Sequence, residues 1–343
     1  MRLYNIHDSK VLKERLIAES FRRRTISFYR YFIVENPQEF RDQIYQDWTE
    51  LNCFGRIYVA REGINAQMSI PEHNLELFFK CLAKYPIFNQ IPVKYAIEDD
   101  GKSFYKLTIK VRHKLVADGL DDDAFDVTNV GRHLSAEEFH ALVDSGEHIL
   151  VDMRNHYESE IGYFKGAIRP ETDTFREEIQ VVTEMLANQK DRKVLLYCTG
   201  GIRCEKASAY LKHHGFSDVG QLHGGILEYV RKIKQLNLTS NFIGKNFVFD
   251  ERMGESVNGE VISHCHQCGK SCDTHVNCAN DLCHLLFIQC EECAQKNDKC
   301  CSPECRTVKN APVEEKLLIR QKNERKFGNS RLYRKSFLLA KKS

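Results

Sequence analysis

A short segment in the middle of the chain combines residues that could perform thiol chemistry. It reads Cys198-Thr199-Gly200-Gly201-Ile202-Arg203-Cys204, after the apolar run 194–197 and before a segment that predicts a helix. A sulfur at this junction lies over the helix N-terminus, where free backbone N–H groups and the positive end of the dipole stabilise a thiolate. The two glycines let several N–H groups converge on one anion, and Arg203 adds a permanent positive charge. We therefore predict that Cys198 is a nucleophile assisted by Arg203, with the other residues of 199–204 forming an active-site loop.

Both cysteines of this loop have a second interpretation. Cys198 could be an ordinary core cysteine in a strand-to-helix turn, although the two glycines and the arginine disfavour this. Cys204 could be a resolving thiol that attacks an oxidised or persulfidated Cys198, or it could simply pack inside the first helical turn.

A second group of cysteines lies near the end of the chain and has the spacing of metal ligands. Two Cys-x2-Cys pairs about twenty residues apart predict a structural zinc site, because each tight turn places two thiolates on one tetrahedral metal. We assign the first site to Cys265, Cys268, Cys290 and Cys293. A second site could use Cys278, Cys283, Cys301 and Cys305, with Cys272, Cys300, His275 and His284 as possible substitutes. Reduced cysteines without metal remain an alternative, and no four-cysteine ferredoxin spacing indicates an iron–sulfur cluster.

Length and composition predict a cytoplasmic enzyme of two or three domains. The chain has 343 residues, fourteen of them cysteine, and 42% of its residues are hydrophobic. It contains no apolar run long enough to span a membrane and no secretory signal pattern, so we expect no membrane association. In such a protein, cysteines indicate metal binding or thiol chemistry more than disulfides.

The charge is distributed unevenly along the sequence. From Arg306 onward there are twelve Lys or Arg residues and three Glu, so this tail has a net charge of +9. The whole chain has a net charge of +2, so the rest of the chain carries −7. A basic tail that also contains Tyr333 and Phe337 fits a nucleic-acid contact. A solvated helix with a frayed end would explain the charge equally well.

The elements before the loop predict a separate α+β domain over 1–117. Strands are expected at 25–34, 55–60, 63–70, 93–97 and 105–111, and helices at 10–21, 37–51 and 71–85. This βαββαβ order is that of a ferredoxin-like or acylphosphatase-like sandwich, a common platform for RNA. The turn at Arg61-Glu62 is either a plain hairpin turn or a turn whose backbone approaches a ligand. Lys110, Arg112, His113 and Lys114 could contact phosphates or be a solvated strand edge.

The remaining elements predict a linker, a second α/β domain and a cysteine-rich segment. Residues 118–131 are acidic and loop-like, and we interpret them as the linker. In 132–240, strands and helices alternate as in a doubly wound parallel sheet, whose ligands bind at the carboxyl ends of the strands, where Cys198 lies. Asp152 and Arg154 are expected to form a scaffolding ion pair. Residues 241–343 hold the cysteine-rich segment, which we expect to bind zinc, and the basic tail.

The central domain resembles the rhodanese family. The matching features are the Cys198 loop, the segments 149–158 and 162–167 with Asp-x-Arg and Gly-x-x-x-Gly-Ala patterns, and the strand and Gly-Gly turn of 219–226. Tyr163 and Lys165 depart from the usual His and Pro. Related phosphatases have a Cys-x5-Arg loop that accommodates phosphate, whereas Arg203 comes one residue sooner, which suits a smaller sulfur-centred group and disfavours a phosphatase.

The whole chain resembles the bacterial tRNA uridine hydroxylases, a rhodanese-domain family. The resemblance rests on Arg61-Glu62-Gly63-Ile64-Asn65-Ala66-Gln67, on the Cys198 loop and on Cys265-His266-Gln267-Cys268-Gly269. It implies oxygen-dependent hydroxylation of C5 of the wobble uridine, position 34, to 5-hydroxyuridine. It also implies the tRNA anticodon loop as partner, molecular oxygen as co-substrate, and the loop cysteine, here Cys198, as the active-site residue.

A mechanism follows as a hypothesis. Cys198, as thiolate or persulfide, could add to C6 of uracil and make C5 electron-rich, or it could carry the oxygen as oxidised sulfur. Arg203 and the loop N–H groups would stabilise charge on the uracil oxygen, and the base must leave its stack. The sequence has no flavin or nicotinamide fingerprint and no facial triad of an iron oxygenase. The alternatives are a sulfurtransferase that passes a Cys198 persulfide sulfur to an acceptor, and a non-catalytic RNA-binding or zinc-scaffold module.

Overall fold

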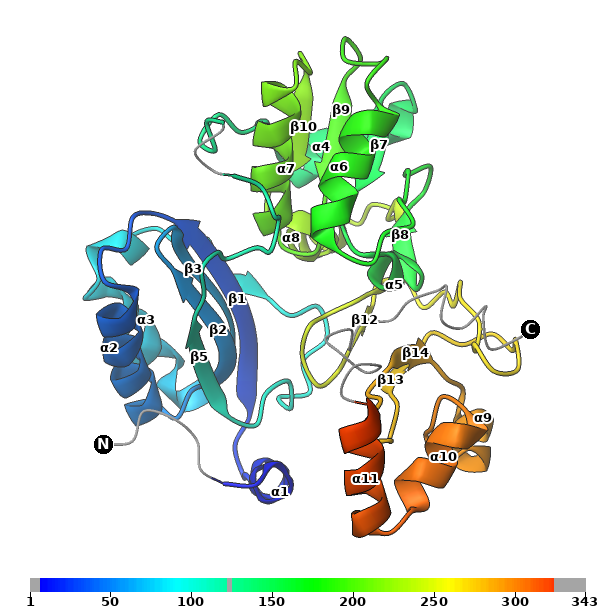
Figure 1. Cartoon of the computed structure of the whole chain (residues 1–343). Helices are drawn as coiled ribbons and strands as arrows, with labels where there is room; N and C mark the ends of the chain where they lie inside the picture. The colour runs from blue at the N-terminus through cyan, green and yellow to red at the C-terminus, as the bar shows by residue number, and fades with distance from the viewer. Residues whose placement is uncertain (1–6, 122–124, 324–343) are drawn as a thin grey trace.

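The chain forms three packed regions in a computed structural model that describes residues 7–121 and 125–323 (Figure 1). After the short helix α1 (Ser9–Ile17), the first region contains a five-stranded sheet of order β4-β1-β3-β2-β5. Its strands are β1 (Arg23–Tyr31), β2 (Phe54–Ala60), β3 (Gly63–Pro71), β4 (Lys94–Tyr95) and β5 (Leu107–Val111). All neighbours pair antiparallel except β2 and β5, which are parallel. The first four strands have the predicted acylphosphatase-like arrangement, and β5 extends it.

The two faces of this sheet differ because side chains alternate along a strand. The helices α2 (Pro37–Glu50) and α3 (Leu75–Ala83) cover one face, where Phe28, Ile57 and Ile64 join Trp48 in the core. The opposite face carries mainly polar side chains. Residue 71 departs from our expectation: Pro71 ends β3 instead of starting a helix, and a short 3-10 turn, η1 (Glu72–Asn74), precedes α3. A residue before proline favours extended backbone, so the strand continues to this point.

The central region is a parallel sheet with helices on both faces, as expected for a doubly wound fold. Its order is β6-β10-β9-β7. The strands are β6 (Arg132–Leu134), β7 (Ile149–Asp152), β9 (Val194–Tyr197) and β10 (Val219–Leu222). The helices are α4 (Ala136–Ser145), α5 (His156–Ser159), α6 (Phe175–Met185), α7 (Ile202–His213) and α8 (Gly225–Gln235). One buried cluster packs α6 and α7 against the sheet, and a second packs α4 and α8 against its other face.

The chain then returns to the central region before it reaches the cysteines. Strand β11 (Phe242–Asn246) pairs antiparallel with β8 (Gly162–Phe164) and with β12 (Glu255–Ser256). The segment after residue 240 is therefore attached to the central fold by a strand ladder.

The C-terminal region is small. It contains the hairpin β13 (His275–Asn277) and β14 (Leu286–Ile288), followed by α9 (Glu291–Lys296), α10 (Pro303–Asn310) and α11 (Val313–Asn323). Half of the residues in its buried cluster are cysteines, which pack around Phe287 and Ile288. Tyr333, Phe337 and most of the basic tail lie outside the described residues. Within the part of the chain that the structure describes, no helix has the length and apolar character needed to cross a membrane.

Candidate active site

Cys198 follows the last residue of β9 and precedes α7, so its sulfur lies at the N-terminus of a twelve-residue helix. The side chain is 1% exposed, and its Sγ accepts the Gly201 N–H at 3.1 Å. Gly201 has φ of +99°, which only glycine adopts easily and which turns its N–H toward the sulfur. Burial raises the pKa of Cys198. The Cys204 thiol, the Arg203 guanidinium and two backbone N–H groups outweigh it and lower the pKa to about 5.

Cys204 lies in the first turn of α7 and is fully buried. Burial raises the pKa of Cys204 well above its usual value, and its contact with the Cys198 thiolate adds to this. Cys204 therefore remains a protonated donor to Cys198 at neutral pH. This close contact is compatible with both the packing and the resolving role.

Arg203 binds a carboxylate that the sequence interpretation did not assign to it. Its Nη1 and Nη2 donate to Oε1 and Oε2 of Glu158 at 2.6 and 2.8 Å, and Glu158 is fully buried. Glu158 also accepts the Asn155 N–H, which caps the short helix α5. The capping-box spacing of Asn155 and Glu158 in the sequence could have marked Glu158 as a structural residue. That spacing does not reveal that Glu158 binds Arg203, which lies 45 positions away.

The expected pair of Asp152 and Arg154 is present and lies below the loop. Arg154 Nε and Nη2 donate to the two oxygens of Asp152 at 2.8 and 2.7 Å, and Nη2 also donates to Gly162 O. Both side chains are fully buried. The pair connects the end of β7 to β8 and therefore supports the fold around the loop.

A cavity of about 410 Å³ separates the Cys198 loop from the polar face of the N-terminal sheet. This size is within the range of small-molecule sites and can accommodate a nucleobase. Its three main walls are the loop, strands β1 to β4, and the segment 248–255, and the segments 115–117 and 173–175 also contribute to the lining. The first two walls touch directly, since a Cβ added to Gly201 would lie 2.8 Å from the Tyr29 hydroxyl.

Two residues of the sheet wall were missed by the sequence interpretation. The Tyr29 hydroxyl donates to Glu205 at 3.0 Å. Lys94 is 6% exposed, and its Nζ lies 4.4 Å from the centre of the Tyr29 ring. Burial lowers the pKa of Lys94 to about 8, although Cys198, Glu205 and Glu228 favour its charged form. No motif marks either residue, because they approach the loop only through domain packing.

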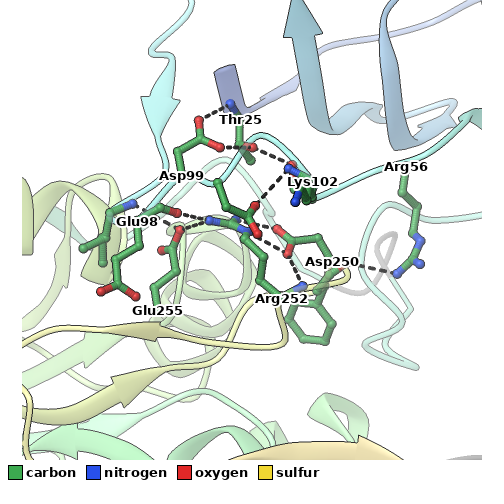
Figure 2. Close-up of polar contacts among 12 residues, drawn as sticks. Thr25, Arg56, Glu98, Asp99, Lys102, Asp250, Arg252 and Glu255 are labelled. Carbon is green, nitrogen blue, oxygen red and sulfur yellow. Dashed lines mark hydrogen bonds and ion pairs between the residues drawn. The ribbon is translucent and has the colours of Figure 1, made fainter. Parts of the chain in front are cut away.

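The third wall is held by an ion-pair network (Figure 2). Arg252 Nε and Nη2 donate to the two oxygens of Asp250 at 2.9 and 2.6 Å, and Arg252 also binds Glu255 and the Glu98 carbonyl. Arg56 of β2 donates to the Phe249 carbonyl at 3.1 Å. These contacts attach the segment 248–255 to the N-terminal domain and so close the cavity.

The predicted basic group before the linker lies apart from this cavity wall. Lys110, Arg112 and His113 are exposed, whereas Lys114 binds the buried Asp118 at 2.9 Å. The first three residues are therefore available to contact phosphates, and Lys114 stabilises the fold through its ion pair with Asp118.

The cysteine-rich segment brings together the two expected sets of four residues. The four sulfurs of Cys265, Cys268, Cys290 and Cys293 lie within 4.8 Å of one another, and the same holds for Cys278, Cys283, Cys301 and Cys305. Adjacent sulfurs, such as those of Cys268 and Cys290, are 3.6 to 3.8 Å apart. Four thiolates around a tetrahedral zinc at about 2.3 Å are separated by about 3.8 Å, whereas a disulfide measures about 2.05 Å. Both sets can therefore hold a metal ion, and the four possible substitutes belong to neither set.

Comparisons with known proteins agree with this architecture. Three family models match in succession: a UPF0176 acylphosphatase-like domain over 23–115, a rhodanese-like domain over 135–232, and a rhodanase C-terminal model over 243–306. A relative from Leptospira interrogans is 57% identical and aligns over 95% of this chain and 89% of its own length. Relatives from Photorhabdus laumondii and Salmonella typhimurium are 52% and 53% identical, over 94% and 88% of this chain and 92% and 87% of their own lengths. All three are named tRNA uridine(34) hydroxylase.

The fold and site thus define a rhodanese-like protein whose thiolate loop faces an acylphosphatase-like domain. The sequence identity to these relatives, over nearly the full length of the chain, identifies one family within this class. The chain belongs to the tRNA uridine(34) hydroxylase family.

Proposed function

We propose that this enzyme hydroxylates C5 of uridine 34 in tRNA and produces 5-hydroxyuridine, with oxygen from O2. The observation that carries the proposal is the 57% identity to a tRNA uridine(34) hydroxylase over nearly the whole chain. The Cys198 thiolate and the cavity beside it support the assignment independently, because they offer a nucleophile and room for one base. The substrate is the anticodon loop, and the enzyme works in the cytoplasm.

In the mechanism, Cys198 acts as the nucleophile. Its sulfur adds to C6 of the uracil, and the electrons of the C5–C6 double bond move toward C4 and its oxygen. C5 then attacks an electrophilic oxygen, loses its proton, and the S–C6 bond breaks to restore the aromatic base and the thiolate. The second oxygen atom of O2 leaves as water, which requires two electrons from an external two-electron reductant and two protons.

Two cationic residues near the loop, Arg203 and Lys94, have different roles in this mechanism. Because both guanidinium nitrogens of Arg203 bind Glu158, Arg203 acts on the sulfur through its field and holds the loop in shape. The buried cation of Lys94 on the opposite wall is available to stabilise negative charge that develops on the base. Zinc in the two cysteine sets stabilises the C-terminal region and takes no part in these steps.

A sulfurtransferase is the second candidate, favoured by the rhodanese-like loop itself. In that reaction Cys198 would carry a persulfide sulfur and pass it to an acceptor. Both reactions require Cys198, so loss of activity in a Cys198→Ala variant does not separate them, and the product must be identified.

Nucleoside mass spectrometry of bulk tRNA tests the proposal. Cells that lack the gene should lose 5-hydroxyuridine and its alkoxy derivatives, and wild type but not Cys198→Ala should restore them. If these nucleosides are unchanged while thiolated nucleosides fall, the protein is a sulfurtransferase.

A further inference from the structure

The polar face of the N-terminal sheet carries two amide side chains that have no role in the fold. Asn65 and Gln67 lie two residues apart on β3, so both point to the same face, and both line the cavity with Cys198. Each is half-buried. Within residues 7–121 and 125–323, neither amide group has a hydrogen-bond partner in the protein.

Their neighbours are fixed by strand register. Asn65 lies between Tyr29 of β1 and Tyr58 of β2, and Gln67 lies between Ser27 and Arg56. Tyr29 and Arg56 are themselves held by bonds to Glu205 and to the Phe249 carbonyl. The two amides are therefore presented from the centre of the sheet, and the tyrosines on either side of Asn65 offer aromatic rings on which a base can stack.

We infer that Asn65 and Gln67 are specificity-determining residues that bind the O2, N3 and O4 edge of the target uracil. This inference rests on the proposed function. An amide offers one acceptor and two donors, which match the N3–H donor of uracil and its two carbonyl acceptors. The opposing wall supports the same orientation. C5 and C6 lie across the ring from N3 and O2, so a base bound to the sheet by this edge presents C5 and C6 to the Cys198 loop.

The inference also explains why polar residues stand in the middle of β3. Half-buried amides without a protein partner lose part of their hydration, which costs free energy unless a ligand or water binds them. Asparagine is, in addition, among the residues depleted in strands. Both costs are offset if the amides are occupied by the base during catalysis.

The test compares binding of two anticodon stem-loop RNAs, one with uridine and one with cytidine at position 34, by fluorescence anisotropy with the full chain. Asn65→Leu and Gln67→Met should each weaken binding of the uridine RNA about tenfold and reduce its preference over the cytidine RNA. Gln46→Met is the matched control, because Gln46 is an exposed amide on α2, on the opposite side of the sheet. It should bind both RNAs like wild type.

Asn65→Asp and Gln67→Glu preserve shape and guard against misfolding, which thermal melting would also detect. A carboxylate accepts from the cytosine amino group but cannot donate to uracil O4, so the preference should shift toward cytidine. The added negative charge repels both RNAs equally, so this repulsion does not affect the ratio of the affinities for the uridine and cytidine RNAs.

The inference is overturned if folded variants at both positions retain the affinity and the uridine preference of wild type. That result would leave the proposed function intact as long as wild type still restores 5-hydroxyuridine in cells. Absence of 5-hydroxyuridine with wild type would instead refute the proposed function.

Discussion

The reactivity of Cys198 depends on neighbours that only the folded loop provides. Its pKa of about 5 lies below the usual value, so the thiolate is present above about pH 5 and is lost as the pH falls through it. We predict that alkylation of Cys198 by iodoacetamide, followed by mass spectrometry of its peptide, changes little from about pH 6 to about pH 8. An ordinary thiol with a pKa of about 8.5 reacts about tenfold faster for each pH unit in this range.

Cys204→Ala provides the complementary test of this prediction. It removes a donor to the thiolate, so the midpoint of the alkylation profile should move to higher pH. An unchanged profile would mean that the backbone N–H groups and Arg203 suffice without the thiol.

Breaking the ion pair of Arg203 and Glu158 should lower the stability of the protein strongly, because both partners are buried. We predict that Glu158→Gln lowers the free energy of unfolding by about 3 kcal/mol, since it leaves a buried guanidinium without its counter-charge. Urea denaturation measures this. Glu76→Gln removes a partner from the exposed pair of Glu76 and Lys80 and should change stability little. Equal effects of the two variants would contradict the prediction.

At the scale of elements, the C-terminal region lacks an apolar core large enough to hold it together without metal. Its hairpin and helices are short, and half of the residues in its buried cluster are cysteines. We predict two zinc ions per chain by metal analysis. Chelation should make residues 265–305 sensitive to protease while leaving the parallel sheet folded.

Single substitutions locate the metal dependence. Cys265→Ser should lower the zinc content by about one ion per chain, because three remaining ligands bind weakly. Cys272→Ser is the matched control, since Cys272 is buried in the same region but belongs to neither set. Loss of zinc from the control would show that the ligand sets are different.

At the scale of the whole molecule, Lys206 joins the central domain to the N-terminal domain and to the segment that follows it. It lies on α7 with 2% of its side chain exposed, 2.9 Å from Glu62 in the β2–β3 turn and 3.8 Å from the buried Asp118. The Arg61-Glu62 turn, interpreted as a hairpin or a ligand loop, therefore has a third role in docking the two domains. Asp118, expected in an acidic, loop-like linker, is part of the same contact.

We predict that Lys206→Met destabilises the chain by about 3 kcal/mol and exposes the segment 112–121 to limited proteolysis. The reason is that Glu62 loses its buried counter-charge and Asp118 keeps Lys114 but loses Lys206 as a cationic partner. Lys234→Met changes an exposed lysine of α8 and should have little effect. A Lys206 variant that is as stable and as protease-resistant as wild type would show that docking depends on apolar packing instead.

The sequence by itself determined the features that depend on neighbouring residues. A strand, a Gly-Gly turn and a helix place Cys198 at a helix N-terminus wherever they occur, and Cys-x2-Cys turns bring thiolates together in the same way. The alternation of strands and helices also predicted both α/β regions, because hydrophobic periodicity reports local structure. Pro71 was assigned to a helix because proline suits both a helix start and a strand end.

Only the tertiary structure decided which distant residues meet at the site. Glu158 binds Arg203 across 45 positions, and Tyr29, Asn65 and Lys94 reach the cavity from another domain. These contacts follow from strand order, register and the docking of two sheets, none of which leaves a local signature. The physical reason is that a nucleophile can be made reactive by its own helix and turn, whereas a cavity that selects its substrate requires opposing walls, and these come from parts of the chain that only folding brings together.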